Sequence, residues 1–205
     1  MFNLIQRTVF YRTLPIFLLL TGLNVRSQTL SYFLVNATLI TYSDDTLNTI
    51  IKFGNEFNLQ FTITATDTIT DRDTIYSPRE IKQFYYIVNK DTVSYFSKNS
   101  PIDQISVFMK LLYHGKKDLY QFVTLNKKKA PMVLQVEYFI WNNGWELPAI
   151  SPDNELESLL AHFSNCFELQ YKIKSHEYGL QQIKRIIQEY ENCKLTDDKY
   201  EFFNE

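Results

Sequence analysis

The sequence predicts an α+β fold, in which a mostly antiparallel β-sheet or small open barrel is followed by a disulfide-linked C-terminal helical unit. Between residues 31 and 150, short runs of Val, Ile, Thr and aromatic residues alternate with turn-forming clusters, as strands joined by tight turns do. After Ser151 the apolar residues recur at helical spacing instead. The two cysteines of the chain, Cys166 and Cys193, both lie in this second part.

Residues 1–27 have the pattern of a signal peptide that precedes the folded part. Arg7 and Arg12 form a basic region, Leu14–Val25 is mostly apolar, and Ser27 is a small residue at the expected cleavage point. We therefore expect an exported protein that is periplasmic or associated with the outer membrane. Because Arg26 lies unusually close to the cleavage point, an uncleaved signal that anchors the chain is the alternative.

The composition indicates a chain with a substantial core and without a basic surface. Of the 205 residues, 45% are hydrophobic and 16% are aromatic, which differs from the composition of disordered proteins. The formal net charge of −2 does not provide the basic surface that a nucleic-acid partner requires, so we expect no such partner. The apolar run near the N-terminus is shorter than the ~20 residues of a membrane-spanning helix, and we expect no transmembrane span in the mature chain.

Residues 28–150 are predicted to form the antiparallel β domain, whose strands are bounded by turn residues. Asn89-Lys90 separates two strand-like runs in the manner of a two-residue hairpin turn. The segment 77–80 combines a capping Ser, a Pro and a Glu at helix-start spacing, which predicts one helical turn. The expected strands are Phe33–Thr41, Thr46–Phe53, Phe57–Ile63, Phe84–Val88, Thr92–Phe96, Ile105–Tyr113, Leu119–Leu125, Met132–Trp141 and Trp145–Ile150.

Residues 151–195 are predicted to form a helix–strand–helix cap packed on the sheet, and residues 196–205 a tail. A strong helix start lies at 151–153, and a second helix is expected to end near Cys193. Between the two helices, residues 167–174 alternate apolar and polar side chains, which favours an extended segment. The residues expected to pack on one face of the sheet are Leu156, Leu160, Phe163, Ile183 and Ile187.

Cys166 and Cys193 are expected to form a disulfide, which is the usual state of two cysteines in a small exported protein. The alternatives are a pair of buried free thiols and a nucleophilic Cys166 with His176 nearby. A disulfide requires the two Cα atoms within about 7 Å of each other. Because both cysteines follow predicted helices, the extended connector between them is expected to carry the chain back before the second helix begins.

The sequence contains none of the common catalytic, nucleotide-binding or metal-binding motifs, so we expect no catalytic residues, no cofactor and no metal site. Four weaker candidates each have a structural alternative. A calcium loop or an acidic turn is possible at Asp67, Asp71 and Asp73, and an anion-binding or simply solvated hairpin tip at Lys127–Lys129. Sugar stacking or core packing is possible at Trp141 and Trp145, and the histidines His114, His162 and His176 lack ligand spacing.

Four stretches of the chain together resemble an uncharacterised exported domain common in Bacteroidota. They are Ser43–Leu47, Tyr76–Phe84, Val107–Phe122 and Leu159–Cys193. In many relatives this domain precedes an outer-membrane β-barrel. Because 12 residues follow Cys193, we expect any such barrel to belong to another chain. The sequence departs from the pattern at Asp44, which replaces a turn Gly, and beside Cys166, where Asn165 and Phe167 replace Asp and Pro. The resemblance implies no catalytic residues.

A repeated tripeptide in the sequence has two interpretations. Asp followed by Thr and an aliphatic residue begins at Asp45, Asp67, Asp73 and Asp91. This tripeptide resembles the O-glycosylation acceptor of exported Bacteroidota proteins. The simpler interpretation is an Asp that closes a turn and a β-branched Thr that opens a strand.

These observations predict a non-enzymatic cell-envelope module that binds an envelope or outer-membrane protein, or an envelope surface. A first alternative is a periplasmic protein that binds a small ligand in a pocket between the sheet and the helices. A second alternative is an envelope hydrolase whose carboxylates come from distant positions, such as Glu80 and Asp118.

Overall fold

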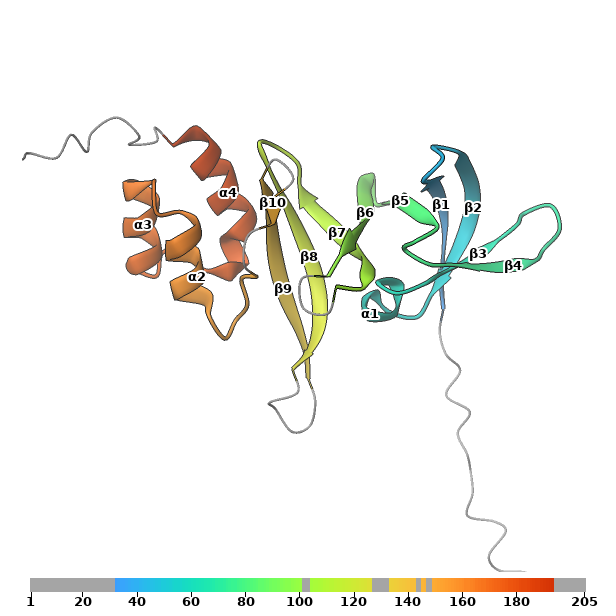
Figure 1. Cartoon of the computed structure of the whole chain (residues 1–205), viewed down its shortest axis with the longest axis horizontal. Helices are drawn as coiled ribbons and strands as arrows, with labels where there is room; N and C mark the ends of the chain where they lie inside the picture. The colour runs from blue at the N-terminus through green and yellow to red at the C-terminus, as the bar shows by residue number, and fades with distance from the viewer. Residues whose placement is uncertain (1–31, 101–103, 127–132, 143–144, 147–148, 194–205) are drawn as a thin grey trace, which may run out of the picture. The chain divides into compact units, whose positions relative to one another are not determined.

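The strands of the described chain form one antiparallel sheet, and a helical unit packs against one end of it, which confirms the predicted fold class (Figure 1). The computed structural model describes residues 32–100, 104–126, 133–142, 145–146 and 149–193. Ten strands lie in the order β10-β9-β8-β7-β6-β5-β1-β2-β3-β4. They are β1 (Phe33–Thr41), β2 (Thr46–Phe53), β3 (Ile63–Thr66), β4 (Asp73–Tyr76), β5 (Ile81–Val88), β6 (Asp91–Asn99), β7 (Ser106–Tyr113), β8 (Lys117–Asn126), β9 (Val133–Asn142) and β10 (Trp145–Glu146).

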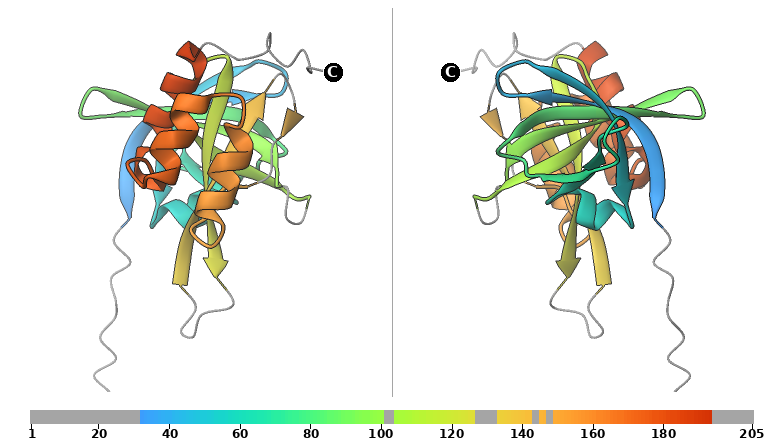
Figure 2. Two further views of the ribbon diagram at one scale, coloured as in Figure 1. Left: turned by 90° about the vertical axis from the view of Figure 1, so that its left-hand side faces the viewer. Right: turned by 90° about the vertical axis from the view of Figure 1, so that its right-hand side faces the viewer.

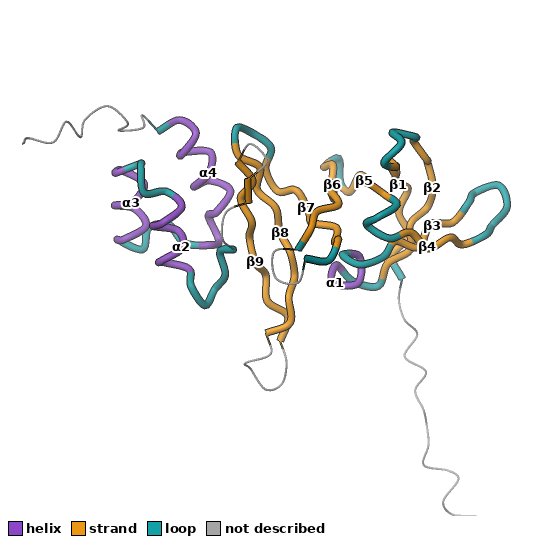
Figure 3. Tube along the Cα trace, viewed as in Figure 1, coloured by secondary structure: helices purple, strands orange, loops and turns teal. Residues whose placement is uncertain are grey.

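Most neighbouring strands in the sheet are also neighbours in the sequence, and the exception is at β1. This strand pairs with β2 on one side and with β5 on the other, so that β2, β3 and β4 extend the sheet away from β5 (Figure 3). The predicted hairpin turn between β5 and β6 is confirmed. Asn89 and Lys90 have φ angles of 50° and 76°, the left-handed conformations that a tight hairpin turn of the primed type needs.

The helices of the described chain are short, and three α-helices and one 3₁₀ helix form the C-terminal unit. The bounds are α1 (Glu56–Leu59), α2 (Glu155–His162), α3 (Phe167–Lys174), the 3₁₀ helix η2 (Leu180–Gln182) and α4 (Ile183–Asn192). The C-terminal helices lie against β8 and β9 (Figure 2). Helices of this length are marginal in isolation, so their stability depends on this packing.

Both faces of the sheet contribute to the core. We call face A the side that carries Leu39, Phe84 and Phe108, and face B the side that carries Met109 and Tyr120. Face A buries one cluster on β1–β7, and a second where the helical unit covers Leu119 and Ile140 of β8 and β9. Face B buries a third cluster on β7–β9, made of Val107, Met109, Tyr120, Phe122 and Phe139.

Gln60, directly after α1, joins β7 to β8 where the two strands separate. The β7–β8 ladder includes Lys110↔Gln121 but no pair farther toward the start of β7. In that gap, the Gln60 side chain donates to the Val123 carbonyl oxygen at 2.9 Å and accepts from the Val123 N–H. The Gln60 carbonyl oxygen also accepts from the Phe108 N–H at 2.8 Å. Gln60 is 2% exposed and acts as one residue of a strand inserted between β7 and β8.

The expectation of a strand over Phe57–Ile63 is wrong. Residues 56–59 form α1, which Asn55 caps by accepting from the Asn58 N–H at 2.9 Å, and β3 begins only at Ile63. In a strand, the apolar residues at 57, 59, 61 and 63 would share one face, but here they do not. Leu59 joins the core of face A and Phe61 packs against that of face B. The alternation therefore reflects a chain that passes from one core to the other.

The C-terminal cap contains three α-helices and the 3₁₀ helix η2, so the helix–strand–helix expectation is wrong at residues 167–174. These residues form α3, and its buried side chains Leu169 and Ile173 are one helical turn apart. The packing expectation holds for Phe163, Ile183 and Ile187, and Leu160 is partly buried against the same cluster. Leu156 is 43% exposed, and Leu159 occupies the buried position in its place.

Of two smaller expectations, one differs from the structure and one agrees with it. The last expected strand, Trp145–Ile150, is reduced to the two-residue β10 and an isolated bridge between Tyr138 and Ile150. The segment 77–80 forms a turn, as its sequence indicates. The Glu80 carboxylate accepts from the Ser77 N–H at 2.8 Å and from its hydroxyl at 2.7 Å, and these bonds lower the pKa of Glu80.

Replacing Gln60 with Ala tests the connection between β7 and β8. The substitution removes both side-chain hydrogen bonds to Val123. The backbone N–H and C=O of Val123 then stay buried without these partners. Because each buried unsatisfied group costs about 1–3 kcal/mol, we expect the free energy of unfolding to fall by about 2–4 kcal/mol, measured by urea denaturation. Gln83→Ala, at a half-buried position of β5, is the matched control and is expected to cost less than ~0.5 kcal/mol. Equal losses in the two variants contradict the role of the Gln60 amide.

Candidate functional site

The candidate site is the place where β1 and β5 separate, which we call the fork. The ladder between these strands runs from Ala37↔Tyr86 toward the end of β1. By contrast, β1 pairs with β2 from Phe33 onward, and β5 pairs with β6 as far as Val88. The first four residues of β1 and the last two of β5 therefore extend beyond the last β1–β5 pair. Each strand has one paired edge there, and the other edge turns toward the gap.

A groove of about 760 Å³ lies at the fork. None of the described residues that line it is charged. They are Leu34, Val35, Asn36, Ala37 and Thr38 of β1, Asn48 and Thr49 of β2, Thr68, and Tyr85, Tyr86 and Ile87 of β5. The groove therefore presents apolar, amide and hydroxyl groups only, which favour a ligand that is itself uncharged.

Large apolar side chains are exposed around this groove. Leu34 of β1 is 61% exposed and Ile87 of β5 is 66% exposed, and both lie on face B. Phe33, at the start of β1, and Val88, at the end of β5, are exposed as well. Soluble monomers rarely gather exposed apolar side chains unless the surface binds something.

On face A the base of the fork is a row of aromatic rings. The Phe53 ring lies 5.5 Å from that of Phe33 and 5.9 Å from that of Tyr86, between ring centroids. Tyr86 in turn stacks on Tyr95 at 6.3 Å. Burial raises the pKa of both tyrosines, so both phenols stay neutral. The Tyr95 hydroxyl is buried and has no hydrogen-bond partner among the described residues. The aromatic row therefore borders the fork on face A with uncharged side chains.

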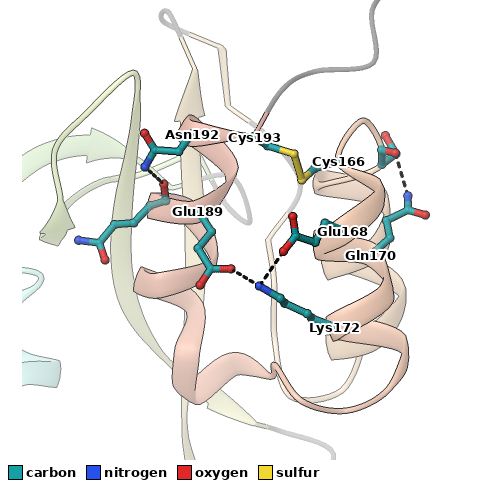
Figure 4. Close-up of a disulfide and its surroundings, with 9 residues drawn as sticks. Cys166, Glu168, Gln170, Lys172, Glu189, Asn192 and Cys193 are labelled. Atoms are coloured by element: carbon teal, nitrogen blue, oxygen red, sulfur yellow. Dashed lines mark hydrogen bonds and ion pairs between the residues drawn. A yellow bond between two sulfur atoms is a disulfide. The ribbon is translucent and has the colours of Figure 1, made fainter. Parts of the chain in front are cut away.

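The predicted disulfide between Cys166 and Cys193 is confirmed, but the chain reaches it differently (Figure 4). Cys166 is the N-cap of α3 and Cys193 is the C-cap of α4, and their Cα atoms are 6.1 Å apart. The start of α3 therefore meets the end of α4, as in an antiparallel helix pair. The return path that we expected from an extended connector is provided by α3 itself. A pair of free thiols and a nucleophilic Cys166 are excluded.

Ionic contacts hold the same two helices together beside the disulfide (Figure 4). The Lys172 ammonium of α3 lies 3.0 Å from the Glu189 carboxylate of α4 and 3.3 Å from that of Glu168. Glu189 also accepts from the Tyr178 hydroxyl and from Arg185 Nε at 3.0 Å. The Tyr178 hydrogen bond, with those from Lys172 and Arg185, lowers the pKa of Glu189. The bond to Glu189 raises the pKa of Lys172.

The acidic cluster that suggested a calcium loop forms turns and a cross-strand ion pair. Asp67 accepts from the backbone N–H of Ile69 at 2.7 Å, and these turn bonds lower its pKa. Asp73 lies 2.8 Å from the Lys52 ammonium and accepts from the Thr66 hydroxyl. Asp71 lies at a left-handed turn position. Within the described ranges, no group of three or more His, Cys, Asp or Glu side chains is placed to hold a metal ion.

The remaining sequence candidates are spread over the fold. Trp141 packs on Tyr120 at 5.7 Å between ring centroids, and the Lys98 ammonium lies 4.8 Å from its ring, so core packing is the observed role. His114 contacts the Asp118 carboxylate at 2.7 Å on the surface. Asp118 lies on β8 and Glu80 precedes β5, and β6 and β7 separate them in the sheet. The structure therefore does not bring this carboxylate pair together.

Several expectations fall on residues outside the described ranges. These are the signal peptide at 1–27, the lysines at 127–129, the tail at 196–205 and the side chain of Trp145. No described helix is long and apolar enough to cross a membrane. The Asp-Thr tripeptides lie at strand openings in three cases, because Thr46 opens β2, and Asp73 and Asp91 open β4 and β6. The turn–strand interpretation holds there, and glycosylation stays a prediction.

No protein-family model matches the chain, and no curated protein or solved structure is significantly similar to it. The resemblance to a Bacteroidota envelope domain therefore stays a prediction. The fork was not among the sequence candidates. The adjacent apolar residues at 33–34 and 87–88 were visible as parts of strands, but nothing local indicated that β1 and β5 would separate beside them.

Removing the disulfide is expected to weaken the helical unit. In the chain-entropy treatment, a crosslink across 27 residues is worth about 3.5 kcal/mol. We expect the Cys166→Ser, Cys193→Ser double variant to lose about that much unfolding free energy in urea denaturation. Treatment with a reductant is expected to cause the same loss in the wild type and no further loss in the double variant. Unchanged stability in both experiments contradicts a structural role for the bond.

The contribution of Glu189 to stability is expected to depend on pH. The folded-state pKa of Glu189 lies below its ordinary value of 4.5. Its contribution is therefore fully present above about pH 4.5 and is lost as the pH falls through the folded-state pKa. We expect Glu189→Gln to cost up to about 1 kcal/mol at pH 7, and the difference from wild type to shrink in urea titrations below pH 4.5. Glu157→Gln, on the exposed side of α2, is the control. A difference that grows in acid contradicts the assignment.

Proposed function

We propose that the protein is a non-enzymatic interaction module that binds an extended segment of a partner protein at the fork. The observation that carries this proposal is the pair of strand edges at the fork, bordered by exposed apolar side chains. Addition of a strand to an available sheet edge is a common mode of peptide recognition. Backbone hydrogen bonds provide affinity in this mode, and alternate side chains provide specificity.

The geometry of the fork defines the kind of segment that fits. The overhang of β1 covers four residues, so a bound segment pairs over about four or five residues at ~3.3 Å each. Successive side chains of the segment point to opposite faces. Those on face B meet Leu34 and Ile87, and those on face A meet the ring row at Phe53. Because the lining is uncharged, we expect apolar and β-branched residues in the segment and no charged residue at its centre.

We further propose that the partner is an envelope or outer-membrane protein, and that this protein is exported to the periplasmic or outer-membrane side. The signal-peptide pattern of residues 1–27 and the resemblance to barrel-linked domains support this location, with retention of the signal as an anchor as the alternative. The disulfide is weaker support for an oxidising compartment. The first alternative from the sequence, a ligand pocket between the sheet and the helices, is not favoured because apolar side chains fill that interface.

A peptide-display selection on the purified protein tests the fork. We expect enrichment of uncharged segments that alternate apolar or β-branched residues, and binding measured by fluorescence anisotropy of the selected peptide. Leu34→Asp and Ile87→Asp place a charge in the groove and are expected to weaken binding at least about tenfold. Both residues are exposed, so the effect on stability is expected to be within about 0.5 kcal/mol.

Ile75→Asp is the matched control, because Ile75 is 65% exposed and lies on the far edge strand β4. This variant is expected to bind like the wild type. Enrichment of no peptide, or equal binding by all three variants, contradicts the proposed function.

A further inference from the structure

A second cleft, of about 750 Å³, lies beside Gln60 on face B of the sheet. We call it the β8–β9 cleft. Its described walls are the end of α1, the C-terminal half of β8, the start of β9 and the turn at 151–154. A cleft of this size is in the range of small-molecule sites. No residue of this cleft lines the fork, so the two sites are separate.

One wall of the cleft is aromatic. Phe57 and Phe61 lie on either side of Gln60, and their rings meet edge to face with centroids 5.3 Å apart. Phe122 of β8 continues this apolar wall. Phe57 and Phe61 are partly exposed, although fully burying a Phe side chain stabilises the folded state by about 1.5–3 kcal/mol. Their position leaves apolar ring surface open to a bound molecule.

Beside Phe122, a second wall is a chain of polar side chains on β8 and β9. The Thr124 hydroxyl donates to the Glu137 carboxylate at 2.9 Å. The Asn126 amide donates to the Gln135 side-chain oxygen at 2.6 Å and to the Asp153 carboxylate at 3.4 Å. These contacts hold the side chains in place. Hydroxyl, amide and carboxylate groups each take part in several hydrogen bonds, so the wall offers both donors and acceptors to a ligand.

The charges of the described lining residues disfavour an anionic ligand. Glu137 and Asp153 are acidic, and no Lys, Arg or His is among the described residues that line the cleft. Among the described lining residues, an anionic ligand would meet carboxylates and no compensating cation. A neutral molecule with many hydroxyl groups and an apolar face satisfies both walls.

We infer that the β8–β9 cleft binds a neutral sugar. The C–H face of a pyranose ring packs on the Phe57–Phe61 wall, because aromatic rings bury apolar surface there. Its hydroxyl groups bond to the wall formed by Thr124, Gln135 and Glu137, whose side chains accept and donate as sugar hydroxyls require. This inference does not rest on the proposed function of the fork.

Saturation-transfer NMR with a defined panel tests the sugar site. The neutral probes are maltose, cellobiose, mannobiose and N,N′-diacetylchitobiose, and glucuronic acid and choline are the anionic and cationic probes, each at millimolar concentration. We expect saturation transfer to at least one neutral disaccharide and none to glucuronic acid or choline. No transfer to any neutral disaccharide, or stronger transfer to either charged probe, overturns the inference.

Two nearly isosteric variants assign the binding to the polar wall. Thr124→Val and Gln135→Leu each remove one hydrogen-bonding side chain, and each is expected to weaken binding of the responding disaccharide by roughly two- to tenfold. Thr64→Val, on β3 and outside the cleft, is the matched control and is expected to bind like the wild type. Thermal unfolding of all three variants verifies folding. Full binding by both cleft variants, or equal loss in Thr64→Val, overturns the assignment.

Discussion

The hydrogen bonds between Gln60 and Val123 connect two parts of the sheet that are buried in different ways. Up to β7, face A is buried within the β domain, and from β8 onward the helical unit buries it instead. At this transition β7 and β8 separate, and the buried backbone N–H and C=O of Val123 have no partner in the β7–β8 ladder. A glutamine supplies a donor and an acceptor from one side chain, and this satisfies both groups.

The same residue explains why a single sheet can hold three cores. Although Gln60 lies in the line of the sheet, its neighbours Leu59 and Phe61 point to opposite faces, which residues two apart in a regular strand do not do. One packs into the core of β1–β7 and the other into the core of face B. The short helix α1 positions this segment, and its Asn55 cap fixes where the helix begins. The β8–β9 cleft opens directly beside this insertion, so its aromatic wall is a consequence of the same geometry.

Most strands could be predicted from the sequence because each carries a local signal. The Asn89-Lys90 turn and the β-branched runs beside it are examples. The two wrong assignments, at 57–63 and 167–174, have a common physical cause. Apolar residues at i, i+2 and i+4 satisfy the two-residue period of a strand, but the first and last of them also lie one helical turn apart. Leu169 and Ile173 have this spacing, and only the packing of α3 against α4 decides between the two structures.

The disulfide could be predicted because the sequence offers one possible pair, whereas the fork and the cleft could not. Both depend on where neighbouring strands stop pairing, and register is set by contacts between distant segments. The sequence shows that Leu34 and Ile87 are apolar and in strands. Whether such residues are buried depends on where the β1–β5 ladder ends, at Ala37↔Tyr86. The fork is therefore a property of the assembled sheet.

The stability of the helical unit and the chemistry of the two candidate sites involve different parts of the molecule. Helices α2, α3 and α4 are too short to persist alone, and they depend on the Cys166–Cys193 bond and on packing against Leu119 and Ile140. The fork lies on β1 and β5, and the cleft borders this unit only at the turn before α2. The fork opens on both faces of the sheet at β1 and β5 and the cleft lies on face B, whereas the helices cover face A of β8 and β9. Covering face A of β8 and β9 lets those strands present their other face to a ligand without exposing the core.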